Sequence, residues 1–225
     1  MRNLRVTTVV FSIVVILLLA GSAFADSTVN MTFLGPGGNN SGGVYTYPYN
    51  FSINGGSPVS LICDAFNNEV YSGETWTATV TSLVSAAGMF SGQSNAALDY
   101  KAAGLIFQGI LAGNIDPNAG NWAIWGLFSD LTNNSYFENS NALSIESTYL
   151  ALAATASDSM FNGLVVYDPN PGSQPNGLGV PQEYIGYAQP VPEPGMVTLL
   201  ITAALCGLLG MVFRKQLKSK LAVAL

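Results

Sequence analysis

The sequence contains no histidine and little charge of any kind. Charged residues make up 9% of the 225 positions, against about 25% in an average soluble protein. Without histidine, the chain cannot form a Ser-His-Asp or Cys-His catalytic arrangement or a histidine metal ligand, and it has no side chain that ordinarily titrates near neutral pH. No Asp-x-Asp-x-Asp-Gly loop or glycine-aspartate nonapeptide repeat occurs either. We therefore predict a protein that is not an enzyme and has no cofactor and no dedicated metal site.

Basic side chains are almost absent from the middle of the chain. Between Asp26 and Gln189 the sequence has twelve acidic residues and one basic residue, Lys101, which gives a net charge of −11. The remaining basic residues flank the two apolar ends of the chain: Arg2, Arg5, Arg214, Lys215, Lys218 and Lys220. Because phosphate binding needs Lys and Arg in quantity, this charge distribution excludes nucleic acid as a partner.

The first 25 residues have the three parts of a secretory signal peptide. Two arginines precede an apolar run over Val6 to Leu19, and small residues, Ala23 and Ala25, stand three and one positions before the expected cut. The apolar run has about 14 residues, which is short for a membrane span. We predict cleavage by signal peptidase before Asp26, and hence export.

The C-terminal end predicts a membrane anchor. Residues 195–213 carry no charge, and a helix of that length reaches roughly 28 Å, about the hydrocarbon thickness of a bilayer. Arg214 and Lys215 follow at once, so the positive-inside tendency places the tail 214–220 in the cytoplasm and the preceding domain outside. The chain is thus divided into a signal peptide (1–25), an acidic extracytoplasmic domain (26–190) and a terminal segment (191–220).

The terminal segment resembles a known sorting signal. It begins with Val191, Pro192, Glu193 and Pro194, continues with the apolar helix, and ends in the basic pair Arg214 and Lys215. This order resembles the PEP-CTERM signal of Gram-negative bacteria. The resemblance implies that an exosortase, a membrane transpeptidase, recognises the Pro-Glu-Pro residues and processes the protein. It also implies a location at the inner membrane first, and then at the cell surface or in the exopolysaccharide matrix.

Strand patterns come first within the extracytoplasmic domain. Apolar and polar residues alternate over 29–33, 44–53 and 75–84, with Gly and Asn clusters between these stretches. In the second stretch Tyr45, Tyr47 and Tyr49 share one face with Phe51, and Pro48 places the strand at a sheet edge. We interpret this aromatic row as core, with a carbohydrate-stacking surface as the alternative.

Helical patterns occupy the middle of the domain. Leu98 to Leu111 has helical apolar spacing with Asn95 as its cap, and Asp116-Pro117 is typical of a second helix start. A third apolar pattern covers 145–156, and a strand over 164–167 follows. We predict an α+β fold with a strand-rich N-terminal part and a helical middle, plus an N-terminal signal helix and a C-terminal transmembrane helix. Several features in this order resemble uncharacterised PEP-CTERM ectodomains, namely Cys63-Asp64-Ala65-Phe66, Gly73 to Ala78, Tyr100 to Ala103, Trp122 to Trp125 and Pro181 to Tyr184.

Cys63 has no partner for a disulfide within the domain, because the other cysteine, Cys206, lies in the predicted span. We interpret Cys63 as a buried, unreactive core residue. The alternative is a reactive thiol, because Cys63 with the later Trp-Ala-Ile-Trp is similar to thioester domains of Gram-positive adhesins. Their cross-linking Gln stands two positions before Ala-Ile-Trp, where this chain has the shorter Asn121.

Three functions remain open after this reading. The leading one is a non-enzymatic protein of the cell surface or exopolysaccharide matrix. The second is an adhesin that binds a glycan or partner through the tyrosine row or Cys63. The third is a carbohydrate-active enzyme that uses two of the carboxylates of Asp64, Glu69 and Glu74, provided that two of them converge in one pocket.

Overall fold

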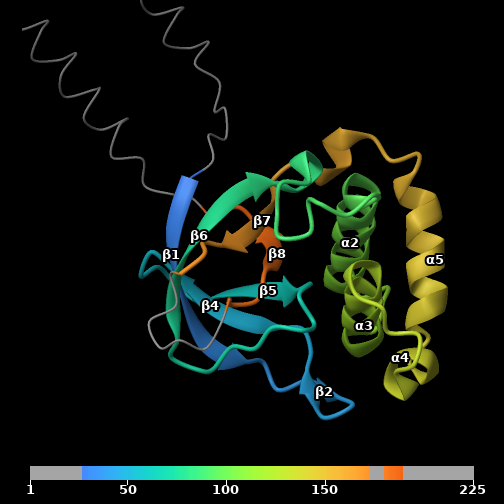
Figure 1. The fold of residues 1–225 in the computed structure, drawn as a ribbon, viewed down its shortest axis with the longest axis horizontal. Coiled ribbons are helices and arrows are strands. Elements are labelled where there is room, and N and C mark those ends of the chain that lie inside the picture. The colour runs from blue at the N-terminus through green and yellow to red at the C-terminus, as the bar shows by residue number, and fades with distance from the viewer. Residues whose placement is uncertain (1–26, 173–179, 190–225) are drawn as a thin grey trace, which may run out of the picture. The chain divides into compact units, whose positions relative to one another are not determined.

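A computed structural model describes residues 27–172 and 180–189, so the predicted signal peptide and the predicted sorting segment, including the span 195–213, lie outside the described residues. Six strands close into an antiparallel barrel in the order β1-β4-β5-β8-β7-β6 (Figure 1). Their bounds are Ser27–Pro36 (β1), Tyr49–Ile53 (β4), Val59–Cys63 (β5), Thr75–Ser82 (β6), Leu164–Pro169 (β7) and Tyr184–Tyr187 (β8). The short pair β2 (Asn40–Ser41) and β3 (Val44–Tyr45) forms a separate hairpin.

The helices form a layer on one side of this barrel (Figure 1). They are α2 (Ala96–Leu111), α3 (Pro117–Phe128), α4 (Ser135–Asn139) and α5 (Ala142–Ala153), with short 3₁₀ turns at η1 (Leu83–Ser85) and η2 (Asp158–Phe161). Helix α5 packs on α2 and α3, and α3 contacts β5 of the barrel. The predicted α+β class, with strands first and helices in the middle, is therefore confirmed. Among the described residues, no helix is long and apolar enough to cross a membrane.

The barrel interior is filled with aromatic side chains. Phe51 of β4 lies with its ring centroid 4.5 Å from that of Tyr184 of β8 and 5.7 Å from that of Trp76 of β6. These three strands are not neighbours in the sheet, so the contacts cross the interior. Apolar residues alternate with polar ones along β1, whose Val29, Met31 and Phe33 are buried, as expected where one face of a strand meets the core.

Strands β5, β8 and β7 are also buried on their outer face, which points away from the barrel interior, because the helical layer covers it. Ile62 pairs with Ile185, which pairs with Val166, and all three side chains are fully buried. Gly104 lets α2 approach closely, since a Cβ at that position would come within 2.7 Å of Leu83 and 3.1 Å of Phe161. Strands buried on both faces have continuous apolar runs rather than alternating ones, and Leu164 to Tyr167 is such a run.

Two sequence predictions about the tyrosine stretch are wrong. The chain does not form one strand over 44–53, because β3 ends at Tyr45 and β4 begins at Tyr49, just after Pro48. Nor is β4 an edge strand, since it pairs with β1 on one side and with β5 on the other. Pro48 limits pairing as expected from its missing N–H, but it does so by separating two strands.

Candidate functional site

Buried polar and acidic side chains lie where strand β5 ends against the helical layer. Cys63, the last residue of β5, pairs with Tyr184, whose ring lies inside the barrel. Because successive side chains of a strand point to opposite faces, Asp64 and Glu183 lie on the outer face, towards the helices. Both are fully buried. We call Asp64, Glu183 and Tyr100 the carboxyl junction.

Glu183 accepts two hydrogen bonds from the helical side. The Tyr100 hydroxyl of α2 donates to Oε1 at 2.5 Å, and the backbone N–H of Met89 donates to Oε2 at 2.5 Å. Gly88 leaves the room for this approach, because a Cβ there would overlap both the Tyr100 hydroxyl and the Glu183 carboxylate. Glu183 thus ties α2 and the segment after η1 to strand β8.

Asp64 completes the junction, and its environment requires a proton. Neither of its carboxyl oxygens has a hydrogen-bond partner, although both are buried, and the neighbouring acidic group is the carboxyl group of Glu183. Of two neighbouring buried carboxyl groups, one stays protonated, because two such charges repel each other. Burial, and then the charge of Glu183, raises the pKa of Asp64 well above its usual range. We therefore assign a proton to Asp64, which is neutral beside the charged Glu183.

The pKa of Glu183 rises less, because its two donors favour the charged form. Burial raises the pKa of Glu183 to about 7, while the hydrogen bonds from Tyr100 and Met89 act in the opposite direction. Asp168 of β7 lies at the edge of the junction, and its half-buried carboxylate has its pKa raised by burial. Burial, followed by the neighbouring carboxyl groups of Asp64 and Glu183, raises the pKa of the Tyr100 hydroxyl. The junction therefore holds protons more tightly than exposed carboxyl groups do.

The structure brings Cys63 and Asn121 together, as the resemblance to thioester domains implies, but with different contacts. The Asn121 amide N–H₂ of α3 donates to the backbone carbonyl of Cys63 at 2.9 Å, and its Oδ1 accepts from the N–H of Tyr47 at 2.7 Å. Both ends of the amide are used in positioning the backbone. Asn121 is fully buried and joins α3 to β5 and to the turn before β4.

The thiol of Cys63 is poorly suited to nucleophilic chemistry. Cys63 is free and fully buried, and its Sγ lies 3.7 Å from the carbonyl oxygen of Ala65. Burial, followed by the neighbouring carboxyl group of Asp64, raises the pKa of the thiol. Because the thiolate is the reactive species, this environment favours the unreactive core residue that we interpreted from the sequence.

The predicted tyrosine row is not one surface. Tyr45 is 54% exposed and Tyr49 is buried inside the barrel, where its ring lies 5.5 Å from that of Tyr184. Tyr47 is half-buried against Phe107 of α2. Three rings with such different exposure do not form a shared platform for a glycan, so the interpretation as core holds for Tyr49 and Phe51 and is wrong for Tyr45.

The carboxylates suggested for a glycosidase do not share a described pocket. Glu69 accepts a hydrogen bond from the Tyr71 hydroxyl, and Glu74 accepts one from the Tyr71 N–H, whereas Asp64 is enclosed at the carboxyl junction. The two largest pockets described, of about 420 and 440 Å³, lie in the helical layer, and none of the three carboxylates lines them. Within the described ranges, no group of three or more His, Cys, Asp or Glu side chains could hold a metal ion.

Sequence reasoning did not assign Glu183, Tyr100 or Asp168 to a site. Glu183 and Tyr100 fall within two of the segments on which the resemblance to uncharacterised ectodomains rests. For Glu183, the available signal was an acidic residue directly before an apolar strand. Their roles depend on pairing between β5 and β8, which are more than 100 residues apart. The remaining predicted site residues, Ala23, Ala25, Asp26, Val191 to Pro194, Arg214 and Lys215, lie outside the described residues.

Comparisons of the chain with known protein families, curated proteins and solved structures find no match.

Proposed function

We propose that this chain is an exported protein, processed at its Pro192-Glu193-Pro194 motif by an exosortase-type transpeptidase and displayed at the cell surface or in the exopolysaccharide matrix. The observation that carries the proposal is the tripartite C-terminus, in which the proline motif, an uncharged stretch and a basic tail follow one another. A proline-flanked segment is extended and lacks backbone donors, which suits recognition by an enzyme at the membrane surface.

The position of the folded unit supports this division of the chain. Strand β1 begins at Ser27, two residues after the expected signal-peptide cut, and β8 ends at Tyr187, four residues before Val191. In the sequence, each predicted processing site therefore lies outside the strands of the barrel. Cutting at both sites would leave the hydrogen bonds of the barrel intact.

The carboxyl junction and Cys63 support a domain without enzymatic activity. Asp64, Glu183 and Cys63 have raised pKa values of the kind that enzymes use, and each is fully buried. Their hydrogen bonds join strands to helices and reach no described pocket. We assign them the role of holding the helical layer on the barrel, so that a compact domain survives export and display.

The test replaces the prolines of the motif in the native host. We expect the double substitution Pro192→Ala and Pro194→Ala to leave the C-terminal segment uncut and to keep the protein in the inner-membrane fraction. Pro190→Ala, just outside the motif, is the matched control and should be processed normally. If the double variant is cut and distributed like the unchanged protein, the proposal is wrong.

A glycan-binding role is the second candidate, favoured by a pocket rather than by the tyrosine row. The pocket of about 420 Å³ beside α5 is lined by Asn141, Ser144, Thr148 and Tyr149, together with apolar side chains and one acid, Asp116. Amides and hydroxyls next to a ring suit sugar hydroxyls and a sugar face. Tyr149→Ala should abolish any binding on a glycan array, whereas Tyr45→Ala, at the exposed tyrosine of the predicted row, should not affect it.

A further inference from the structure

A second pocket, on the other flank of α5, contains two carboxylates. It has a volume of about 440 Å³ and lies between the start of α2, the end of α3 and the middle of α5. Its lining residues are Gln93, Ser94, Asn95, Asp99, Leu127, Glu146 and Leu150. Asp99 comes from α2 and Glu146 from α5, so the two acids belong to different helices.

Asp99 is buried in this pocket without a partner. Its side chain belongs to a residue that is only 8% exposed, and its carboxylate takes part in no hydrogen bond or ion pair within the described part of the chain. Burial raises the pKa of Asp99 to about 6. A buried carboxylate that lacks a compensating group costs free energy in the folded state.

Glu146 brings a second negative charge to the same pocket. Its carboxylate lies against the backbone of Gly126 on α3, where a Cβ would overlap Oε2. Burial, and then the charge of Asp99, raises the pKa of Glu146. The fold thus holds two carboxylates close enough to repel each other, and packs one of them tightly onto a glycine.

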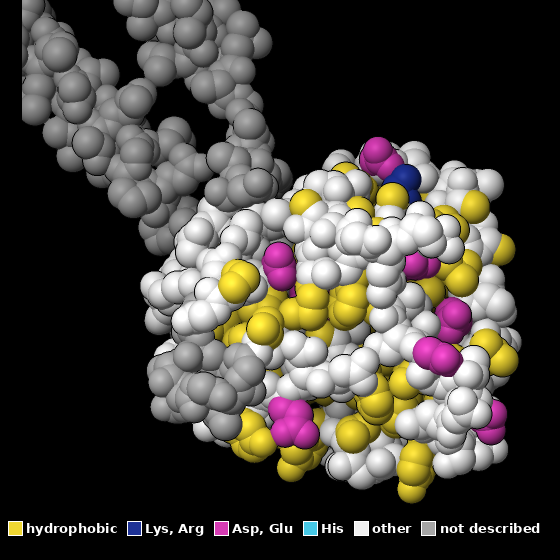
Figure 2. Space-filling model, viewed as in Figure 1, with side chains coloured by type: hydrophobic (Ala, Val, Ile, Leu, Met, Phe, Trp, Pro, Cys, Tyr) yellow, Lys and Arg dark blue, Asp and Glu magenta, His cyan; other side chains and the backbone are white. Residues whose placement is uncertain are grey.

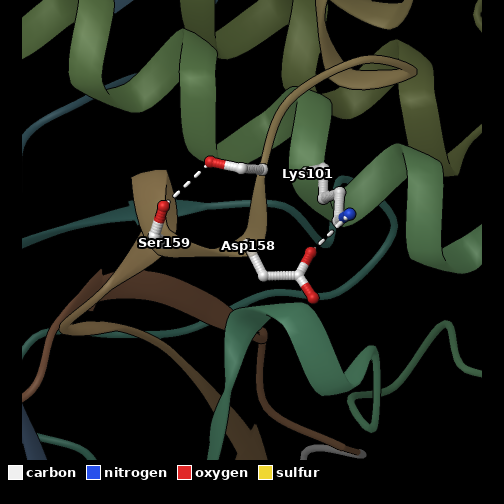
Figure 3. A network of polar contacts seen from close by, with 4 residues as sticks. Lys101, Asp158 and Ser159 are labelled. Atoms are coloured by element: carbon white, nitrogen blue, oxygen red, sulfur yellow. Dashed lines mark hydrogen bonds and ion pairs between the residues drawn. The ribbon is translucent and has the colours of Figure 1, made fainter.

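The described residues offer no cation to balance this pair. They include eleven acidic side chains and one basic side chain, Lys101. Lys101 is already engaged, because its Nζ lies 2.7 Å from Oδ1 of Asp158 (Figure 3). On the face drawn in Figure 2, the one dark blue group lies beside an acidic one, while other acidic groups have no basic neighbour. Within the described ranges, no basic side chain is therefore available to compensate Asp99 and Glu146.

The neutral groups of the pocket add further oxygen ligands. Asn95 stands at the N-cap of α2, yet its side chain makes no capping hydrogen bond, and Gln93 uses its N–H₂ to donate to Phe128 O at 3.1 Å. Their amide oxygens therefore remain available, and Ser94 adds a hydroxyl. Two carboxylates with amide and hydroxyl oxygens form the set that hard divalent cations prefer, and Ca²⁺ above all, because it accepts irregular geometry.

We propose that the pocket formed by Asp99, Glu146 and the residues 93–95 binds a divalent cation, Ca²⁺, and thereby fastens the start of α2 to α5. The sequence contains no linear calcium motif because the ligands come from separate helices. The proposal concerns the folded domain and does not depend on sorting or processing. If the domain is exported as proposed above, the site is filled outside the cell, where calcium-binding modules have dissociation constants of about 10⁻⁴ to 10⁻³ M.

Calorimetric titration of the mature chain with CaCl₂, together with thermal unfolding in EDTA and in CaCl₂, tests the site. We expect saturable binding and a higher Tm in CaCl₂. Asp99→Asn and Glu146→Gln should each weaken Ca²⁺ affinity at least tenfold. Glu138→Gln, at an acid of α4 outside the pocket, should leave the affinity unchanged.

A measurement without calcium separates loss of the site from loss of the fold. In EDTA, Asp99→Asn should unfold at the same temperature as the unchanged protein or at a higher one, because it removes a buried charge without changing the side-chain shape. Three results would overturn the proposal: no binding up to about 10 mM Ca²⁺, an equal loss of affinity in Glu138→Gln, or unaltered affinity in both pocket variants. In the first case, protons alone neutralise the pair.

Discussion

Glu183 and Asp64 are both buried acids, but Glu183 accepts hydrogen bonds and Asp64 does not, so we expect the two to respond differently to the loss of a charge. Glu183 accepts from two donors, one at each oxygen, and one of these donors, the Met89 N–H, cannot reverse its role. In Glu183→Gln an amide N–H₂ would face one of the donors. We expect this substitution to lower the free energy of unfolding by about 1–3 kcal/mol, measured by denaturant titration.

Asp64→Asn is the matched comparison. In our assignment Asp64 is already protonated and neutral, so its replacement by Asn, which is neutral and of the same shape, removes no charge. We expect a change of less than about 1 kcal/mol at neutral pH. Equal losses in Asp64→Asn and Glu183→Gln would mean that the proton is placed on the wrong carboxyl group.

Cys63 should be inert in the folded protein. Its burial and its raised pKa keep the sulfur protonated and inaccessible. We expect iodoacetamide to label Cys63 only after unfolding, as read from peptide masses, and the intact mass to lack the loss of about 17 Da that a thioester with Asn121 would bring. Rapid labelling under native conditions, or that mass loss, would restore the reactive-thiol hypothesis.

Among the structural elements, α3 has the cap that the sequence predicts. The Asp116 side chain accepts from the N–H groups of Asn118 and Ala119 at 3.0 Å, and Pro117 occupies the first turn. Asn95 also stands at its predicted cap position, but it makes no such bond. In EDTA, Asp116→Ala should cost about 1 kcal/mol of unfolding free energy, whereas Asn95→Ala should cost less than about 0.5 kcal/mol. Equal costs would contradict the assigned caps.

The elements differ in how far the sequence could predict them. Helix α3 and strand β1 follow from local signals: a cap with proline in one case and strict alternation in the other. Strand β8 has only four residues, and its partners β5 and β7 lie on either side of it in the closed sheet. No local pattern specifies such a closure, because it depends on pairing between distant segments.

The sequence did not predict the carboxyl junction either, because the junction also depends on pairing between distant segments. Asp64 was a candidate on the basis of its charge alone, and its actual partner Glu183 becomes a neighbour only when β8 pairs with β5. Asn121 was the exception, because its spacing before Ala-Ile-Trp pointed to Cys63, and the two residues are in contact. The spacing did not reveal that this contact runs through the backbone carbonyl.

Strand β8 is also the element whose loss should matter most. A chain that ends at Pro181 lacks Glu183 and Tyr184 and opens the sheet between β5 and β7. We expect it to lack near-UV circular dichroism and a cooperative unfolding transition. A chain that ends at Gln189 should retain both. Cooperative folding of the shorter chain would show that the barrel does not need its closing strand.

For the whole molecule, the buried acids predict that stability falls as pH rises. Glu183 has a folded-state pKa of about 7 and Asp99 of about 6, both above their usual values of 4.5 and 3.8. Between these values the folded state binds more protons than the unfolded one, so the contribution of these groups is full below about pH 4 and is lost as pH rises to about 7. We expect a higher Tm at pH 5 than at pH 8 in EDTA. In Asp99→Asn one of the two groups no longer titrates, so this dependence should be weaker; a Tm that rises with pH would contradict the account.

The central claim is that this acidic domain is exported and sorted through its two ends, and intact mass spectrometry tests it most directly. The protein would be recovered from the envelope and matrix fractions of its native host, and one spectrum reads both termini and the state of Cys63. We predict a mass that lacks residues 1–25 and part or all of the segment after Gln189. A mass with an intact C-terminus would contradict sorting and would identify a plain single-pass membrane protein.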